Sequence, residues 1–213
     1  MSLKQKVISL FFITLLAISV SGFADSTLDV NVDAAMEGTF GMETTADGTP
    51  TNAFVRDFSP NEEAVFRASF LFDPNNMNIA FGGRHLIFAA AANSVNGSRS
   101  IEVQIRRNPS NTFDVRCIAM VTGATAHRNY CGVIPVAFSG PHLFTLEWEA
   151  SQTPGVPGFV QLTVDGVTEG RPVLNFSQRI RASNMGLLGG SIDPGTVGSH
   201  YFDDFQSFRT LAP

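Results

Sequence analysis

Acidic side chains with period-two spacing are the strongest candidates for chemistry in this sequence, because hydrolysis of a glycosidic bond normally uses two carboxyl groups about 5–9.5 Å apart. One alternating stretch places Glu102, Gln104 and Arg106 on the outward face of a predicted strand. Gln104 cannot ionise and Arg106 has the opposite charge, so this row supplies one carboxylate where two are needed. Glu147 and Glu149 also share a strand face, about 7 Å apart along the strand, and we interpret them as solvated glutamates of an outer face.

Other catalytic arrangements lack their residues as well. The sequence contains no G-x-S-x-G nucleophile motif, and no H-x-x-x-H pair that would indicate a zinc enzyme. His142 begins a predicted strand, and we interpret it as a polar edge group. The sequence therefore favours a protein that is not an enzyme, with no catalytic residue assigned. The four histidines are His85, His127, His142 and His200.

The two cysteines, Cys117 and Cys131, lie on neighbouring predicted strands. A turn-like stretch around Ala124 separates these strands, and a hairpin centred there places Cys117 opposite Cys131. Opposite positions in an antiparallel pair come within bridging range. We therefore predict a structural disulfide between them. A reactive thiol pair or two metal ligands are the alternatives.

The N-terminus has the features of a secretory signal peptide. Lys4 and Lys6 precede an apolar run of about 14 residues, which is shorter than the roughly 20 that a membrane-spanning helix needs. Small residues, Gly22 and Ala24, occupy the positions expected before a cleavage site. We predict that residues 1–24 are removed, that the mature chain contains no membrane span, and that the protein is secreted or periplasmic.

Cleavage would remove both lysines and leave 12 arginines against 19 acidic residues. A lysine-free acidic chain argues against nucleic acid as a partner, because phosphates need basic contacts. The missing lysines also exclude Schiff-base catalysis and Walker-type phosphate binding. An aromatic content of 10% argues against disorder.

Period-two alternation dominates the chain after residue 52, and helical periodicity is scarce. Asp165-Gly166 is a strong hairpin signal. About ten strands at spacings of roughly 8–15 residues predict an all-β antiparallel fold with two layers or a closed sheet. No break in composition divides this region, so we predict an extended segment over 25–51 and a single β-sandwich domain over 52–213. The clearest predicted strands are 64–72, 84–90, 100–107, 112–121, 130–136, 142–150, 158–165 and 200–209.

Three stretches resemble the concanavalin A-like lectin/glucanase superfamily, including its laminin G-like modules. Residues 142–149 (HLFTLEWE) are similar to a strand of the type His-x-aromatic-x-Leu-x-Trp, and residues 158–166 (GFVQLTVDG) to a strand ending in Val-Asp-Gly. Residues 198–205 (GSHYFDDF) resemble the last strand of such domains. The resemblance implies a jelly-roll sandwich of two curved antiparallel sheets with the last strand near the first, and the strand count independently fits it.

The resemblance makes calcium the metal to consider, because extracellular modules of this fold often bind it. Asp203 and Asp204 are adjacent, so on a regular strand one of them would point inward and need a partner. That partner could be Ca²⁺, an arginine such as Arg56, or backbone N–H groups. These residues require no cofactor, and calcium at Asp203 and Asp204 stays an open alternative.

Taken together, these features favour a secreted, non-catalytic recognition module that binds extracellular glycan or matrix. Its binding residues are not identified, because Trp148, the only tryptophan, shares its strand face with Phe144 and Leu146 and is predicted to lie in the core. One alternative is a polysaccharide-acting hydrolase or lyase whose site the sequence does not reveal. Another is a structural subunit of a surface assembly.

Overall fold

The computed structural model of the 213-residue chain describes residues 26–91, 99–110, 112–120, 128–176, 178–188 and 192–210, excluding the side chains of 128–131. These residues form thirteen β-strands and no helix, so none of them belongs to a helix that could cross a membrane. The strands are β1 (Thr27–Asn31), β2 (Gly41–Asp47), β3 (Ala53–Asp57), β4 (Val65–Asp73), β5 (Arg84–Ala91), β6 (Arg99–Arg107), β7 (Thr112–Ala119), β8 (Arg128–Ala137), β9 (His142–Glu149), β10 (Gly158–Val164), β11 (Val167–Val173), β12 (Ala182–Leu188) and β13 (Val197–Phe208).

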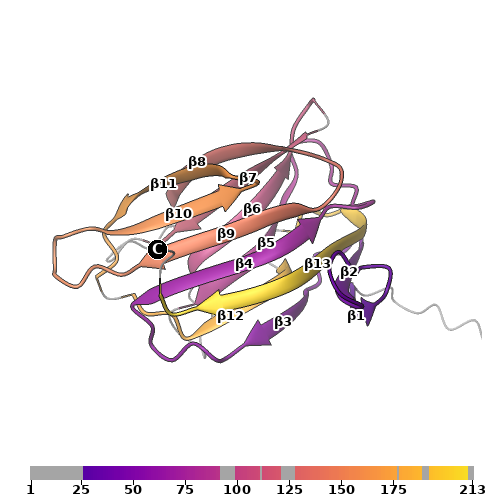
Figure 1. Ribbon diagram of the computed structural model, residues 1–213. Helices are drawn as coiled ribbons and strands as arrows, with labels where there is room; N and C mark the ends of the chain where they lie inside the picture. The colour runs from indigo at the N-terminus through magenta and orange to yellow at the C-terminus, as the bar shows by residue number, and fades with distance from the viewer. Residues whose placement is uncertain are drawn as a thin grey trace, which may run out of the picture.

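The strands stack as two antiparallel sheets (Figure 1). The seven-stranded sheet has the order β1-β2-β13-β4-β9-β10-β11, and the six-stranded sheet has the order β3-β12-β5-β6-β7-β8. The last strand, β13, pairs with β2 near the start of the chain and with β4. This arrangement confirms the predicted jelly-roll sandwich.

Alternation along the strands builds the core between the two sheets. Phe66 and Phe70 point inward from β4 and are completely buried. Phe70 stacks on Phe88 of the six-stranded sheet and on Phe144, with ring centroids 5.5 and 5.2 Å apart. Trp148 is also completely buried, as predicted. Burying one such side chain stabilises by about 1.5–3 kcal/mol, so this aromatic layer contributes much of the stability of the sandwich.

The stretch 25–51, which the sequence predicts as an extended segment, adds two strands to the seven-stranded sheet. β2 lies between β1 and β13, and its Met42, Thr44 and Ala46 are buried. The intervening side chains of β2 are only partly buried. The N-terminal segment is therefore an integral part of the sandwich.

Asp165 and Gly166 form the predicted hairpin turn between β10 and β11. Both have positive φ, 50° and 81°, which is the geometry of a type I′ turn. The Asp165 carboxylate accepts a hydrogen bond from the Leu143 backbone N–H at 2.9 Å and shares one with His142 Nδ1 at 2.6 Å. His142 thus holds the turn against the start of β9.

The disulfide between Cys117 and Cys131 stays a prediction, because the side chain of Cys131 lies outside the described residues. The β7–β8 register supports it by placing residues 130–132 across from Cys117. We expect the intact mass of the mature protein to be two hydrogens below the reduced value. Reduction should lower the free energy of unfolding in denaturant by about 3 kcal/mol, as expected for a loop of about 15 residues. Alkylation of both cysteines in the folded, unreduced protein would contradict the prediction.

Candidate functional site

The outer face of the six-stranded sheet gathers polar side chains from five of its strands. Ile101, Val103 and Ile105 of β6 belong to the core, so the residues between them point away from it. Cross-strand partners lie side by side on the same face, and the register therefore aligns the outward residues in rows. We call this surface the arginine face, and its rows are Arg56–Asn184–Ala89–Glu102, Leu86–Gln104–Arg116–Val133 and Arg84–Arg106–Asp114–Pro135.

Positive charge is concentrated on the arginine face, although the whole chain has a formal net charge of −5. Within the described part of the chain, no carboxylate forms an ion pair with Arg56, Arg84 or Arg106. Arg106 donates from Nε to the Gly82 carbonyl oxygen instead. Uncompensated guanidinium groups on one surface attract anions, so this face suits a polyanionic ligand.

The middle of the arginine face lies below the molecular surface. Gln104 is only 4% exposed, and Leu86 and Ala89 are 1% and 0% exposed, although all three point away from the core. Leu86, Ala89 and Leu188 form a small apolar cluster separate from the main core. Polar groups in such surroundings are shielded from water, which strengthens their electrostatic interactions with a ligand.

Gln104 and Arg116 lie directly opposite each other on β6 and β7 and have unused hydrogen-bond donors. No described residue forms a hydrogen bond with the Gln104 amide, and Arg116 Nε is buried without an acceptor. Buried polar groups are nearly always hydrogen-bonded, so the buried Arg116 Nε without an acceptor, directly across from the Gln104 amide, indicates a ligand site. A carboxylate matches these donors, because a guanidinium and an amide N–H both donate to its oxygens.

Two carboxylates share this face with the arginines. Glu102 lies 3.0 Å from Arg99 Nη1, and Asp114 lies 3.6 Å from Arg116 Nη2. Asp114 is opposite Arg106, four residues beyond Glu102 along β6, which corresponds to about 13 Å. That separation exceeds the roughly 5–9.5 Å of a hydrolase pair. The described residues of this face therefore lack the geometry for hydrolysis.

Glu147 and Glu149 lie on the other side of the molecule, on the outer face of the seven-stranded sheet. Their strand neighbour Trp148 points into the core. Glu147 is 3.6 Å from Arg67 Nε and accepts a hydrogen bond from Gln161 Nε2 at 3.2 Å. Glu147 thus has surface partners, and neither glutamate meets the carboxylates of the arginine face.

Asp203 and Asp204 lie at a β-bulge of β13, where Asp204 has a φ of 46°. The bulge lets both carboxylates avoid the core, which a regular strand would not. Asp203 Oδ2 accepts hydrogen bonds from the backbone N–H groups of Met36 and Glu37 at 2.8 and 2.6 Å. Of the three candidate partners, backbone N–H groups are therefore the ones that bind Asp203, whereas Arg56 donates to Asn184. The described residues contain no group of three or more potential metal ligands, and calcium at this bulge stays a prediction.

Replacement of Asp203 by Asn should loosen the loop before β2, because it removes charge-assisted hydrogen bonds to two backbone N–H groups. We expect the free energy of unfolding to fall by about 1–3 kcal/mol. The exposed neighbour provides the control, and Asp204→Asn should change stability by less than about 0.5 kcal/mol. Chemical denaturation with and without added Ca²⁺ measures both effects. Equal denaturation midpoints for the two variants would contradict the assignment, and stabilisation of the wild type by Ca²⁺ would support the metal.

A pair of histidines lies inside the core. The rings of His85 on β5 and His200 on β13 stack with centroids 5.2 Å apart, and none of their four nitrogens has a hydrogen-bond partner. Burial lowers the pKa of His85 to about 3. Burial, together with the neighbouring His85, lowers the pKa of His200 well below its ordinary value. Both imidazoles are therefore neutral, and they point away from the arginine face.

No protein-family model and no curated protein matches the sequence, whereas several solved structures match the fold. An endo-β-1,4-glucuronan lyase from the fungus Trichoderma reesei is 13% identical, with a TM-score of 0.61 over 87% of each chain. An alginate lyase from Klebsiella pneumoniae is 12% identical, with a TM-score of 0.54 over 82% of this chain and 83% of that chain. The cellulose-induced protein Cip1 is 16% identical, with a TM-score of 0.54 over 88% and 87%. The chain therefore has the concanavalin A-like jelly-roll fold.

These comparisons correct the expectation of a non-catalytic recognition module, because matching structures include catalytic lyases of two polysaccharides. The row of Glu102, Gln104 and Arg106 lacks the two carboxylates of a hydrolase, and the expectation rested on that reaction alone. An amide and arginines are unsuited to that reaction, but they are suited to one that stabilises a negative charge.

Proposed function

We propose that the protein is a lyase that cleaves a uronate-containing polysaccharide by β-elimination on the arginine face. The observation that carries this proposal is the cross-strand pair of Gln104, which is 4% exposed, and Arg116, whose buried Nε has no acceptor among the described residues. The similarity to lyases of glucuronan and alginate supports it, because both of these polysaccharides are polymers of uronic acids. The predicted signal peptide agrees with a substrate outside the cytoplasm.

Elimination begins with removal of the proton on C5, next to the uronate carboxylate. The electron pair of the C5–H bond forms a C4=C5 double bond, the C4–O4 bond breaks, and O4 leaves with its electron pair and takes up a proton. Negative charge moves onto the carboxylate as C5 loses its proton. Donors already directed at that carboxylate stabilise the charge at the moment it develops, and this is the role that we assign to Gln104 and Arg116.

The proton acceptor must lie on the same face. We assign this role to Glu102, because it precedes Gln104 by two residues on β6 and lies about 7 Å from it along the strand. The Glu102→Gln variant should fold normally and lose the double-bond-forming activity. Asp114→Asn, which alters the other described carboxylate of the face, should keep most of it. Ultraviolet absorbance of the product measures both rates, and activity that survives in Glu102→Gln would contradict the assignment.

Hydrolysis is the competing reaction for a polysaccharide-acting enzyme. Glu102 and Asp114 are too far apart for it, and neither Gln104 nor Arg116 could replace the second carboxylate. Elimination needs a proton acceptor at C5 in place of this carboxylate pair, and it consumes no water. The geometry of the described residues therefore favours the lyase.

Incubation of the mature protein with polyglucuronate, alginate and a neutral β-glucan tests the proposal. The conjugated double bond of an elimination product absorbs in the ultraviolet, so absorbance should rise with at least one polyuronate and stay flat with the glucan. Polyglucuronate whose carboxyl groups have been reduced to alcohols is the matched control, and it should not react. Cleavage of the reduced polymer at the same rate would contradict the proposal.

A further inference from the structure

The edge strand β3 brings three side chains together at one end of the arginine face. Phe54 and Arg56 of β3 share the face that carries Asn184, and Phe58 directly follows the strand. The guanidinium carbon of Arg56 lies 5.4 Å from the ring centroid of Phe54 and 5.7 Å from that of Phe58. Arg56 Nε donates a hydrogen bond to Asn184 Oδ1 at 2.6 Å. We call these four residues the β3 clamp.

The β3 clamp holds a cation that no acid neutralises within the described part of the chain. Arg56 uses Nε for Asn184, which leaves the two terminal nitrogens of its guanidinium group available. Asn184 accepts with its oxygen, so its amide N–H₂ is also available. Phe58 is 63% exposed, although most large aromatic residues of this protein are buried. A guanidinium group held between aromatic rings is oriented before a ligand arrives, which reduces the entropy that binding costs.

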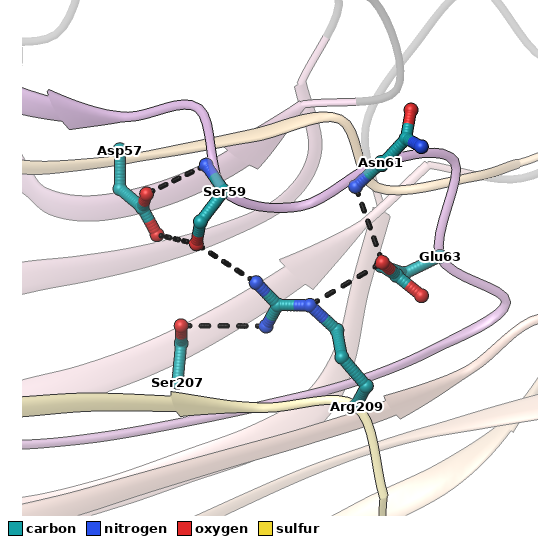
Figure 2. Close-up of polar contacts among 6 residues, drawn as sticks. All are labelled: Asp57, Ser59, Asn61, Glu63, Ser207 and Arg209. Atoms are coloured by element: carbon teal, nitrogen blue, oxygen red, sulfur yellow. Dashed lines mark hydrogen bonds and ion pairs between the residues drawn. The ribbon is translucent and has the colours of Figure 1, made fainter.

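The turn that carries Phe58 is anchored on both sides. Figure 2 shows that the backbone N–H and the hydroxyl of Ser59 donate to the Asp57 carboxylate, at 2.7 and 2.8 Å. Arg209, the residue after β13, donates to Ser59 Oγ at 2.9 Å and lies 3.4 Å from Glu63 Oε1. These contacts connect the end of β3 with β13. Phe58 is therefore presented to solvent by a fixed segment.

We infer that the β3 clamp is a second carboxylate-binding subsite for the same polymer. Its terminal guanidinium nitrogens would bind a uronate carboxylate, while the exposed ring of Phe58 would contact the C–H face of a sugar. β3 and β7 are four strand spacings apart, or about 19 Å, so the clamp would contact a sugar several units away from the one held by Gln104 and Arg116. The inference rests on the proposed function, because it places a polyuronate on the arginine face.

Binding measurements on the full mature chain test the clamp without relying on turnover. The probes are polyglucuronate fragments and the same fragments after reduction of their carboxyl groups. Arg56→Ala should raise the Kd for the uronate fragments about tenfold, the effect of losing one charge-assisted contact, and should leave the Kd for the reduced fragments unchanged. The Kd of Arg56→Lys for the uronate fragments should lie between those of the wild type and Arg56→Ala. Phe58→Ala should weaken binding of both probes, because contact with the ring does not depend on the carboxylate.

Arg67→Ala is the matched control. Arg67 also lies over a phenylalanine ring, 5.3 Å from the centroid of Phe208, but on the outer face of the seven-stranded sheet, and its loss should not change either Kd. Equal affinity of Arg56→Ala, Arg67→Ala and the wild type for polyglucuronate would overturn the clamp. If the wild type forms double bonds while Arg56→Ala binds polyglucuronate as tightly as the wild type, the lyase proposal is supported and the clamp proposal is contradicted. If Arg56→Ala weakens binding of polyglucuronate but not of the reduced fragments, and no double bond ever forms, the clamp proposal is supported and the lyase proposal is contradicted.

Discussion

Replacing Gln104 by Glu is expected to lower kcat/KM for polyglucuronate by at least about 100-fold, the usual effect of losing one donor to a developing anion. The two side chains have nearly the same shape, so the change mainly converts a donor amide into a carboxylate beside Arg116. That carboxylate would pair with the Arg116 guanidinium and repel the carboxylate of the substrate. Because Gln104 has no described hydrogen-bond partner to lose, the fold should be retained.

Initial rates of double-bond formation for the wild type and Gln104→Glu measure this effect. Gln152→Glu is the control, because Gln152 lies in the loop after β9, where its amide donates to the Ala150 carbonyl oxygen. This control should keep the activity of the wild type. A Gln104→Glu enzyme within a few-fold of the wild type would show that the substrate carboxylate is held elsewhere.

Acid should destabilise the protein through His85 and His200. The native state keeps both imidazoles neutral, whereas in the unfolded chain they bind protons below their ordinary pKa of 6.5. The stability that is present above pH 6.5 is therefore lost as the pH falls. For His85 the loss is about 1.4 kcal/mol per pH unit. It continues down to a pKa of about 3 in the folded state, which gives roughly 5 kcal/mol in total. His200, whose pKa is also lowered in the folded state, likewise reduces the free energy of unfolding as the pH falls.

Denaturant unfolding between pH 7 and pH 4 measures this dependence. Because carboxylates also titrate in this range, the informative comparison is with a variant that carries both His85→Leu and His200→Leu. Leucine keeps an apolar side chain of similar size in the core and cannot bind a proton. The wild type should lose stability more steeply than the double variant between pH 6.5 and pH 4. Parallel curves would mean that the two histidines are not neutral and buried together.

Strands with strict alternation could be predicted from the sequence, and the strands with other patterns could not. β4 and β9 contribute every second side chain to the core, so their boundaries agree closely with the predicted ranges. β12 is buried at all seven positions, yet its sequence, ASNMGLL, lacks both alternation and β-branched residues. β11 is exposed at six of its seven positions, so no apolar pattern identifies it. These two strands form because they pair with neighbouring strands, and the local sequence of a strand does not indicate which strands pair with it.

The candidate site was only partly predictable for a similar reason. Period two places Gln104 on an outward face, and it places Arg116 on the outward face of the next strand. That these two residues are neighbours depends on the register between β6 and β7. Asn184 comes from a strand that the sequence does not reveal, and it reaches Arg56 only through the β12–β3 pairing. The pattern of a single strand therefore indicates one residue of each row, and the cross-strand partners follow only from the register.

The ratio of double bonds to new reducing ends is the most direct test of elimination on the arginine face. Each β-elimination creates one conjugated double bond and one reducing end, whereas each hydrolysis creates a reducing end alone. Polyuronate digested by the mature protein should give a ratio of one at every time point, and Gln104→Glu should slow both products equally. Reducing ends that accumulate without ultraviolet absorbance, or an absorbance increase that Gln104→Glu leaves unchanged, would contradict the account.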